Sequence, residues 1–144
     1  MKRSEINYES YSIWAQATAL YARWANDNKM SYPEMVVLYA LMTRKNLSQK
    51  KICENYGLTK QTVNGLINTL EKEELLSLTT NPQDKREKII HLNDEGQAYV
   101  SQKVGRLVEI EESIYRKIGY ERIKESNDTM SLYNLLLEKE LENK

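Results

Sequence analysis

Side chains that can exchange hydrogen bonds with a nucleic acid gather between residues 59 and 88 of this 144-residue chain. The first part of that stretch supplies three uncharged ones, Gln61, Thr62 and Asn64. Gln and Asn pair a donor with an acceptor that suits the major-groove edge of adenine, and Thr can contact a thymine methyl group. The second part supplies three basic ones, Lys85, Arg86 and Lys88. Because arginine is favoured in the negative potential of a narrow minor groove, both parts together predict contact with double-stranded DNA.

Two short helices, a tight turn and a β-hairpin within residues 48–96 would position these side chains. The first helix begins at Ser48 and ends at Gly57, which suits the left-handed conformation at a helix end. Only Leu58 separates it from a second helix over residues 59–74, so the two helices must cross at a steep angle. This order is a winged helix-turn-helix, whose second helix fits the DNA major groove. Without these neighbours, the polar residues would be ordinary solvated surface.

The apolar pattern assigns the two faces of these elements. The residues expected to point inward from the two helices are Ile52, Cys53, Tyr56, Val63, Leu66, Ile67 and Leu70. The hairpin would form a wing over residues 77–92, and its core face would carry Leu76, Leu78, Ile90 and Leu92. The residues left to contact DNA are Ser48, Gln49, Thr59, Lys60, Gln61, Thr62, Asn64, Gly65, Asn68, Lys85 and Arg86.

Longer helices flank this region. Apolar residues at steps of three and four predict helices over residues 6–28, 94–118 and 121–141. A capping box of Ser31 and Glu34 begins another helix, which extends to about Arg44 and is apolar on more than one face. We therefore expect that helix at the centre of the fold.

The flanking helices carry more apolar surface than a small winged lobe can cover. Proteins that bind two-fold symmetric DNA sites need a second subunit, because the two half-sites are one helical turn apart. The predicted fold class is mainly α with a small β-hairpin wing, and the predicted assembly is a homodimer. We expect a single domain over 1–144 that comprises a DNA-binding lobe, 31–93, and dimerisation helices, 1–30 and 94–144.

The charge of the chain is balanced, with 21 basic and 21 acidic residues, whereas DNA-binding domains are often basic. The distribution answers part of that objection, because residues 55–70 contain no acid. No apolar run approaches the ~20 residues needed to cross a bilayer, and the N-terminus has no signal-peptide core. A single cysteine cannot form an internal disulfide, so we expect a cytoplasmic protein without a membrane partner.

Motifs of enzymes and metal sites are absent from the sequence. There is no phosphate-binding glycine loop, nucleophile elbow or metal-binding histidine pair. Cys53 lies beside Ile52 and is expected to be a small buried hydrophobe, with a redox-sensing thiol as the alternative. His91 is the only histidine and is expected on the wing surface, so soft ligands for a structural zinc site are too few. We expect no enzymatic activity, no cofactor and no metal.

The whole chain resembles the multiple-antibiotic-resistance regulator (MarR) family of bacterial winged-helix proteins. The segments QTVNGLINTLEKEELL and NPQDKREKIIHLNDEG carry the resemblance, together with the order of the flanking helices. The most specific short match is Asp84-Lys85-Arg86. The resemblance implies that Arg86 enters a minor groove and that Asp84 shapes the wing loop. Family recognition helices often carry arginines where this chain has Gly65 and Thr69, which shifts phosphate contacts onto Lys60 and the wing.

The resemblance further implies a homodimer that responds to a small-molecule effector. Aromatic residues crowd the first helix at Tyr8, Tyr11, Trp14, Tyr21 and Trp24. They fit a dimer interface and core, or one wall of an effector pocket, for which the candidates are Tyr11, Trp14 and Tyr39. The sequence thus predicts a ligand-responsive transcriptional repressor that binds a pseudo-palindromic operator. The alternative is a winged helix that binds protein instead of DNA, since this fold serves both.

Overall fold

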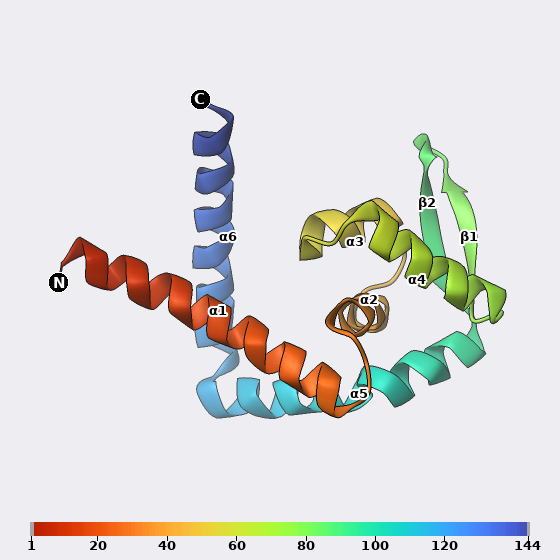
Figure 1. Ribbon diagram of the computed structural model, residues 1–144, viewed down its shortest axis with the longest axis horizontal. Helices are drawn as coiled ribbons and strands as arrows, with labels where there is room; N and C mark the ends of the chain where they lie inside the picture. Colours follow the sequence, from red (N-terminus) through yellow and green to blue (C-terminus); the bar gives the residue numbers. More distant parts are fainter. Residues whose placement is uncertain (1, 144) are drawn as a thin grey trace. The chain divides into compact units, whose positions relative to one another are not determined.

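The computed structural model describes residues 2–143. Helices and strands follow one another in the order α1 (Arg3–Asp27), α2 (Tyr32–Thr43), α3 (Gln49–Tyr56), α4 (Lys60–Lys72), β1 (Leu76–Asn81), β2 (Asp84–Leu92), α5 (Asp94–Ile118) and α6 (Tyr120–Glu142) (Figure 1). The predicted fold class, mainly α with a hairpin wing, is confirmed. None of the helices within residues 2–143 combines the length and apolar character needed to cross a membrane.

The chain forms two compact units, which divide within α5 between Gly105 and Arg106. The first unit contains α1, the winged lobe and the first half of α5. The second contains the rest of α5 and α6. The first unit holds the residues that the sequence assigns to DNA contact.

Helix α2 lies at the centre of the first unit, as its apolar residues predicted. Its N-cap, Ser31, accepts a hydrogen bond from the backbone N–H of Glu34 at 3.2 Å, and Pro33 lies in the first turn. The buried residues of α2 occupy all sides of the helix and are Met35, Val36, Val37, Leu38, Ala40 and Leu41. The neighbouring elements add Ile52, Val63, Ile67, Leu70, Leu76, Ile90, Val100 and Val104 to this core.

The turn between α3 and α4 has the predicted local geometry. Gly57 adopts φ 65°, in the left-handed region that favours glycine. Ser48 and Thr59 cap the two helices through their side-chain oxygens. Helix α3 presents only Ile52 fully to the core, however, and Cys53 is half-buried. The prediction that Tyr56 faces inward is wrong, because this last residue of α3 lies where the chain turns away, and it is 38% exposed.

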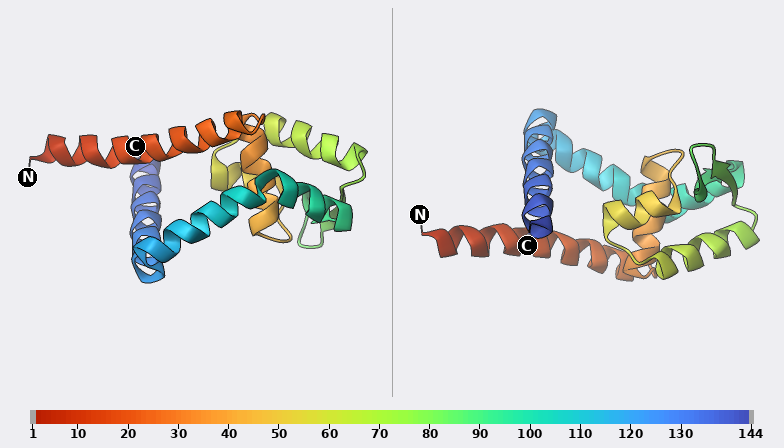
Figure 2. Two further views of the ribbon diagram at one scale, coloured as in Figure 1. Left: turned by 90° about the horizontal axis from the view of Figure 1, so that it is seen from below. Right: turned by 90° about the horizontal axis from the view of Figure 1, so that it is seen from above.

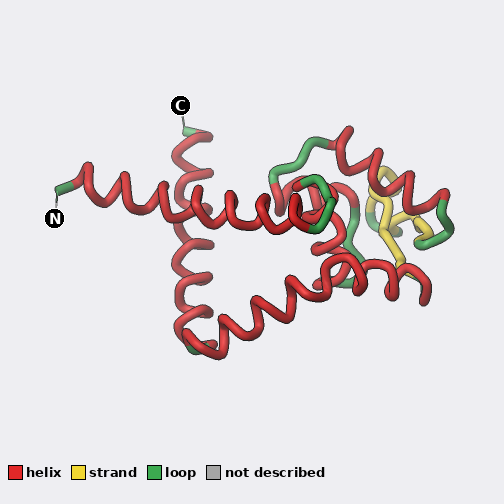
Figure 3. Tube along the Cα trace, turned by 60° about the horizontal axis from the view of Figure 1, so that its bottom comes forward, coloured by secondary structure: helices red, strands yellow, loops and turns green. Residues whose placement is uncertain are grey.

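Strands β1 and β2 form a hairpin (Figure 3). The hairpin is antiparallel, with Leu76 opposite Leu92 and Leu78 opposite Ile90. The turn consists of Pro82 and Gln83, which lie between the two strands. Strand β2 also has a partner on its other edge. The backbone N–H of Ile90 donates to the carbonyl oxygen of Leu47 at 2.8 Å, and Ser48 pairs with Ile89. The wing is therefore attached to the segment that begins α3.

Two contacts fix the start of α5: a side-chain cap from Asn93 and the close packing of Gly96. The side-chain oxygen of Asn93 accepts from the backbone N–H of Gly96 at 2.8 Å. Gly96 lies against the carbonyl group of Leu75, so closely that a Cβ atom there would overlap the carbonyl oxygen. The first turn of α5 is consequently held against the end of the α4–β1 connection.

Helices α1 and α6 expose most of their apolar side chains in their respective units. Helix α1 buries only Ala25 and runs outward from α2, as the two views of Figure 2 show. Its exposed large apolar residues are Ile6, Tyr8, Tyr11, Ile13, Trp14 and Leu20. Helix α6 buries no residue, and its exposed ones are Tyr120, Met130, Leu132, Tyr133, Leu135, Leu136, Leu137 and Leu141.

Candidate nucleic-acid interface

Over residues 61–68 the outer face of α4 is polar and uncharged, and Lys72 follows on the same face. Gln61, Asn64, Gly65 and Asn68 are all exposed, whereas Val63 and Ile67 are completely buried on the opposite side. Within residues 2–143, the amide groups of Gln61, Asn64 and Asn68 take part in no side-chain hydrogen bond. Their donors and acceptors are thus available to a partner.

The N-terminus of α4 is arranged by two threonines. The hydroxyl of Thr59 accepts from the backbone N–H of Thr62 at 3.2 Å and donates to the Thr62 hydroxyl at 2.8 Å. Thr62 is half-buried by this pairing, while Lys60 is exposed. The first turn contains no acidic residue. Because the N-terminus of a helix carries partial positive charge, this end of α4 favours an anionic partner such as a phosphate group.

Hydrogen bonds from side chains to the backbone stabilise the turn at the wing tip. The carboxylate of Asp84 accepts from the backbone N–H of Arg86 at 3.1 Å and lies 3.4 Å from Nε of Arg86. The side-chain oxygen of Asn81 accepts from the backbone N–H of Gln83 at 3.0 Å. The Arg86 side chain is 94% exposed, so its guanidinium group is accessible to a partner.

Glu87 is a residue of the wing that the sequence did not single out. Its carboxylate accepts from Nδ2 of Asn81 at 2.9 Å and from the side chain of Ser48. The bond from Ser48 and then that from Asn81 lower the pKa of Glu87 below its ordinary value, and the charge of Lys50 adds to the effect. Glu87 therefore connects the wing to the start of α3. The one signal for it in the sequence is an acid inside the basic run Lys85-Arg86-Glu87-Lys88.

Ser48 departs from its predicted place among the DNA-contacting residues. The side chain is 2% exposed, and its hydroxyl is engaged by the backbone N–H of Lys51 and by Glu87. Strand β2 covers it through the pairing with Ile89. The side chain therefore faces protein, and we exclude it from the contact set.

The residues assigned to an effector pocket lie on α1 and α2. Tyr11 and Trp14 contact each other on α1, with ring centroids 5.7 Å apart, and they are 71% and 57% exposed. Tyr39 is half-buried on α2.

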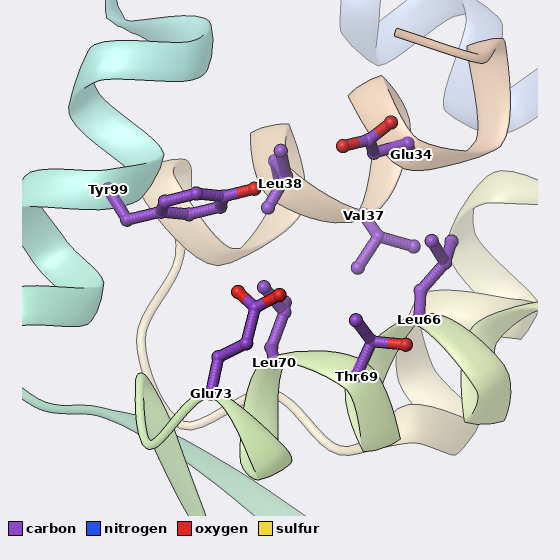
Figure 4. Close-up of a pocket in the computed structure, with 8 residues that line it drawn as sticks. All are labelled: Glu34, Val37, Leu38, Leu66, Thr69, Leu70, Glu73 and Tyr99. Atoms are coloured by element: carbon purple, nitrogen blue, oxygen red, sulfur yellow. The ribbon is translucent and has the colours of Figure 1, made fainter.

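A separate small cavity of about 50 Å³ lies on the inner side of α4 (Figure 4). Its lining comprises Glu34, Val37, Leu38, Leu66, Thr69, Leu70, Glu73 and Tyr99. Burial, followed by the charges of Glu34 and Glu73, raises the pKa of Tyr99.

Residues 30–88 match the sequence profile of the MarR family. The chain is also 26% identical, over 94 residues, to the HTH-type transcriptional repressor NicR of Pseudomonas putida. That alignment covers 65% of this chain and 60% of NicR, so the chain matches less than two thirds of that relative.

Solved structures share the fold over nearly the whole chain. NMB1585, a MarR family regulator from Neisseria meningitidis, superposes with a TM-score of 0.75, 25% identity and complete coverage of both chains. S. aureus MepR in a DNA-binding conformation superposes with a TM-score of 0.64 and 22% identity, over 90% of this chain and 98% of MepR. NicR is thus described as a transcriptional repressor, NMB1585 as a MarR family regulator, and MepR as a protein with a DNA-binding conformation.

Proposed function

We propose that the chain is a transcriptional regulator of the MarR type, whose family model matches residues 30–88, and that it binds a pseudo-palindromic operator as a homodimer. Helix α4 enters the major groove, and the wing reaches the adjacent minor groove. The observation that carries this proposal is the outer face of α4, where three amide side chains are exposed and form no bond within the protein. The 94% exposed side chain of Arg86 at the wing tip supports it.

The proposed DNA-contacting residues lie on α3, α4 and the wing, and they are Gln49, Thr59, Lys60, Gln61, Thr62, Asn64, Gly65, Asn68, Lys85 and Arg86. Asp84 acts indirectly, because its carboxylate bonds to Arg86 keep the wing turn in shape. Thr59 contributes through the N-terminus of α4, which it caps. Gln49 is half-buried at the start of α3 and would contact a phosphate.

Dimerisation is supported by the apolar surface of the terminal helices. Trp14 on α1 is 57% exposed, and Leu136 on α6 is 52% exposed. Large exposed apolar patches mark interaction sites on soluble proteins. A two-fold dimer would place two copies of α4 one helical turn of DNA apart.

Control by a small-molecule effector is the finer part of the proposal. NicR is named a repressor, and by analogy we propose that this chain represses transcription. We propose that it acts in the cytoplasm. The effector would bind beside Tyr11, Trp14 and Tyr39 once a second subunit closes the site. Its binding would change the spacing of the two α4 helices and so the fit to successive major grooves.

The proposal is tested by selecting bound fragments from a pool of random duplexes. We expect enrichment of a two-fold symmetric site with half-sites roughly 10 base pairs apart. Light scattering after size exclusion should give twice the chain mass of 16.9 kDa. A concentration-independent monomer mass would contradict the dimer. Enrichment of no sequence, with weak binding to every duplex, would favour the protein-binding alternative.

A further inference from the structure

Four exposed residues in the first part of α4 form a stripe along the helix. Gln61, Asn64, Gly65 and Asn68 follow one another at steps of three, one and three, which places them on one face. Three of them end in a carboxamide, and the fourth has no side chain. From Gln61 to Asn68 the stripe carries no charged residue; Lys60 lies beside its first turn, and Lys72 follows it on the same face.

Carboxamides and guanidinium groups suit different bases. Adenine presents an acceptor, N7, beside a donor, the N6 amino group, and a Gln or Asn carboxamide can bond to both. Guanine presents two acceptors, which suit Arg or Lys. A stripe with three carboxamides and no cation thus matches adenine and lacks the group that best distinguishes guanine.

We propose that α4 recognises adenine bases through this stripe, so that the operator half-sites are specified by A·T pairs at the contacted positions. This inference rests on the proposed DNA-binding function. From Gln61 to Asn68 the helix rises roughly 10 Å, which equals about three base-pair steps at 3.4 Å per step. The stripe is therefore long enough to contact about three consecutive base pairs.

Gly65 explains how short side chains reach the bases. Asn is shorter than Gln by one methylene, so Asn64 and Asn68 can bond to base edges only where the helix backbone approaches the groove floor. Nothing lies within 4 Å of the position that a Cβ atom of residue 65 would take. No contact in the protein therefore requires glycine there, although glycine weakens a helix relative to alanine. The open position allows the close approach.

The first experiment replaces single adenines of the selected operator by 7-deazaadenine, in which a C–H group stands in place of N7. We expect a roughly tenfold loss of affinity at the contacted adenines, as for a lost bidentate contact. With the Asn64→Ala variant, 7-deazaadenine at the base that Asn64 contacts should cause no further loss. 7-Deazaguanine elsewhere in the half-sites should leave the affinity unchanged.

Two outcomes separate this inference from the function on which it rests. If 7-deazaguanine weakens binding and 7-deazaadenine does not, the adenine assignment is overturned while DNA binding stands. If the wild-type chain binds no duplex at all, the proposed function itself fails.

The second experiment concerns Gly65→Ala. We expect a higher melting temperature, because the added methyl group meets open space, together with an affinity for the operator that falls several-fold. Gln102→Ala, which removes an exposed amide from α5, should leave the affinity unchanged. A lower melting temperature would show that packing within the protein requires glycine at this position. An unchanged affinity would show that close approach to DNA does not require it. Either result overturns the role given to Gly65.

Discussion

The start of α5 and the outer face of α4 each contain a glycine, and the two glycines have opposite surroundings. At Gly96 a Cβ atom would overlap the carbonyl oxygen of Leu75 and crowd a methyl group of Leu92. At Gly65 a Cβ atom would meet nothing within 4 Å. The fold dictates glycine in the first region, whereas no contact within the chain dictates it in the second.

The same contrast holds for the residues around each glycine. Near Gly96 the polar groups are paired, since Asn93 accepts from its backbone N–H and donates to the carbonyl oxygen of Glu74 at 2.6 Å. Around Gly65 the amides of Gln61 and Asn64 are exposed and have no partner in the described chain. Because these amides form no hydrogen bond within the protein, we attribute the choice of residues on this surface to contact with another molecule. Substitutions in the two regions should therefore affect different measurements.

The largest effect is expected from Gly96→Ala. The methyl group would force the start of α5 away from Leu75, at a cost of roughly 3 kcal/mol in the free energy of unfolding. Chemical denaturation measures this value. Gly105→Ala is the matched control in the same helix, because its Cβ would lie 3.4 Å from the Ser101 hydroxyl, an ordinary contact. Equal stabilities for the two variants would contradict the contrast.

Gln61→Ala should change binding and leave stability unaltered. Loss of its base contact should cost about 1–3 kcal/mol per half-site on the selected operator and little on a scrambled duplex. Fluorescence anisotropy on both duplexes measures the difference. Equal losses on the two duplexes would mean that Gln61 contacts the DNA backbone.

Arg86→Ala should weaken binding to both duplexes alike. Its guanidinium group reaches phosphates and a minor groove that distinguishes little beyond A·T from G·C. The slope of log K against log salt should become shallower by about one unit per wing. Stability should stay constant, because the ion pair with Asp84 is exposed and such pairs contribute little. A salt titration that gave the wild-type slope would remove Arg86 from the interface.

The smallest effect is expected from Glu87→Gln, which keeps the side-chain oxygen and removes the charge. Because hydrogen bonds lower the pKa of Glu87 in the folded state, the ionised carboxylate contributes stability at neutral pH. That contribution is lost as the pH falls below about 4.5, the ordinary value, and through the lowered pKa. Melting curves from pH 3 to 7 should show wild type and variant converging at the acid end. A gap that is constant with pH would indicate that the charge plays no part.

Local signals accounted for much of the fold. Ser31, Ser48 and Thr59 are helix caps, and Gly57 is a left-handed terminator, because each depends on residues only a few positions away. The spacing of apolar residues likewise gave the central position of α2. These features could be predicted because their physical causes lie within one or two turns of helix.

Features that depend on distant partners could not be predicted. Ser48 is buried because β2, which is remote in sequence, pairs with it. Glu87 bonds to the Ser48 side chain because the same strand, β2, lies beside the start of α3. The exposure of Tyr56 also follows from where the chain turns after α3 and not from its spacing to Ile52. The DNA-contacting assignment of α4 rests on its outer face alone, and it stays a prediction for the experiments above.

Helix α6 has a thermodynamic consequence of its own. None of its residues, Tyr120–Glu142, is buried, so α6 lacks the tertiary packing that supplies most helical stability in proteins. If a second copy covers its leucines, the folding of this helix becomes a bimolecular equilibrium. Dilution would then unwind α6 before the winged lobe melts, and the circular dichroism at 222 nm would fall with protein concentration at constant temperature.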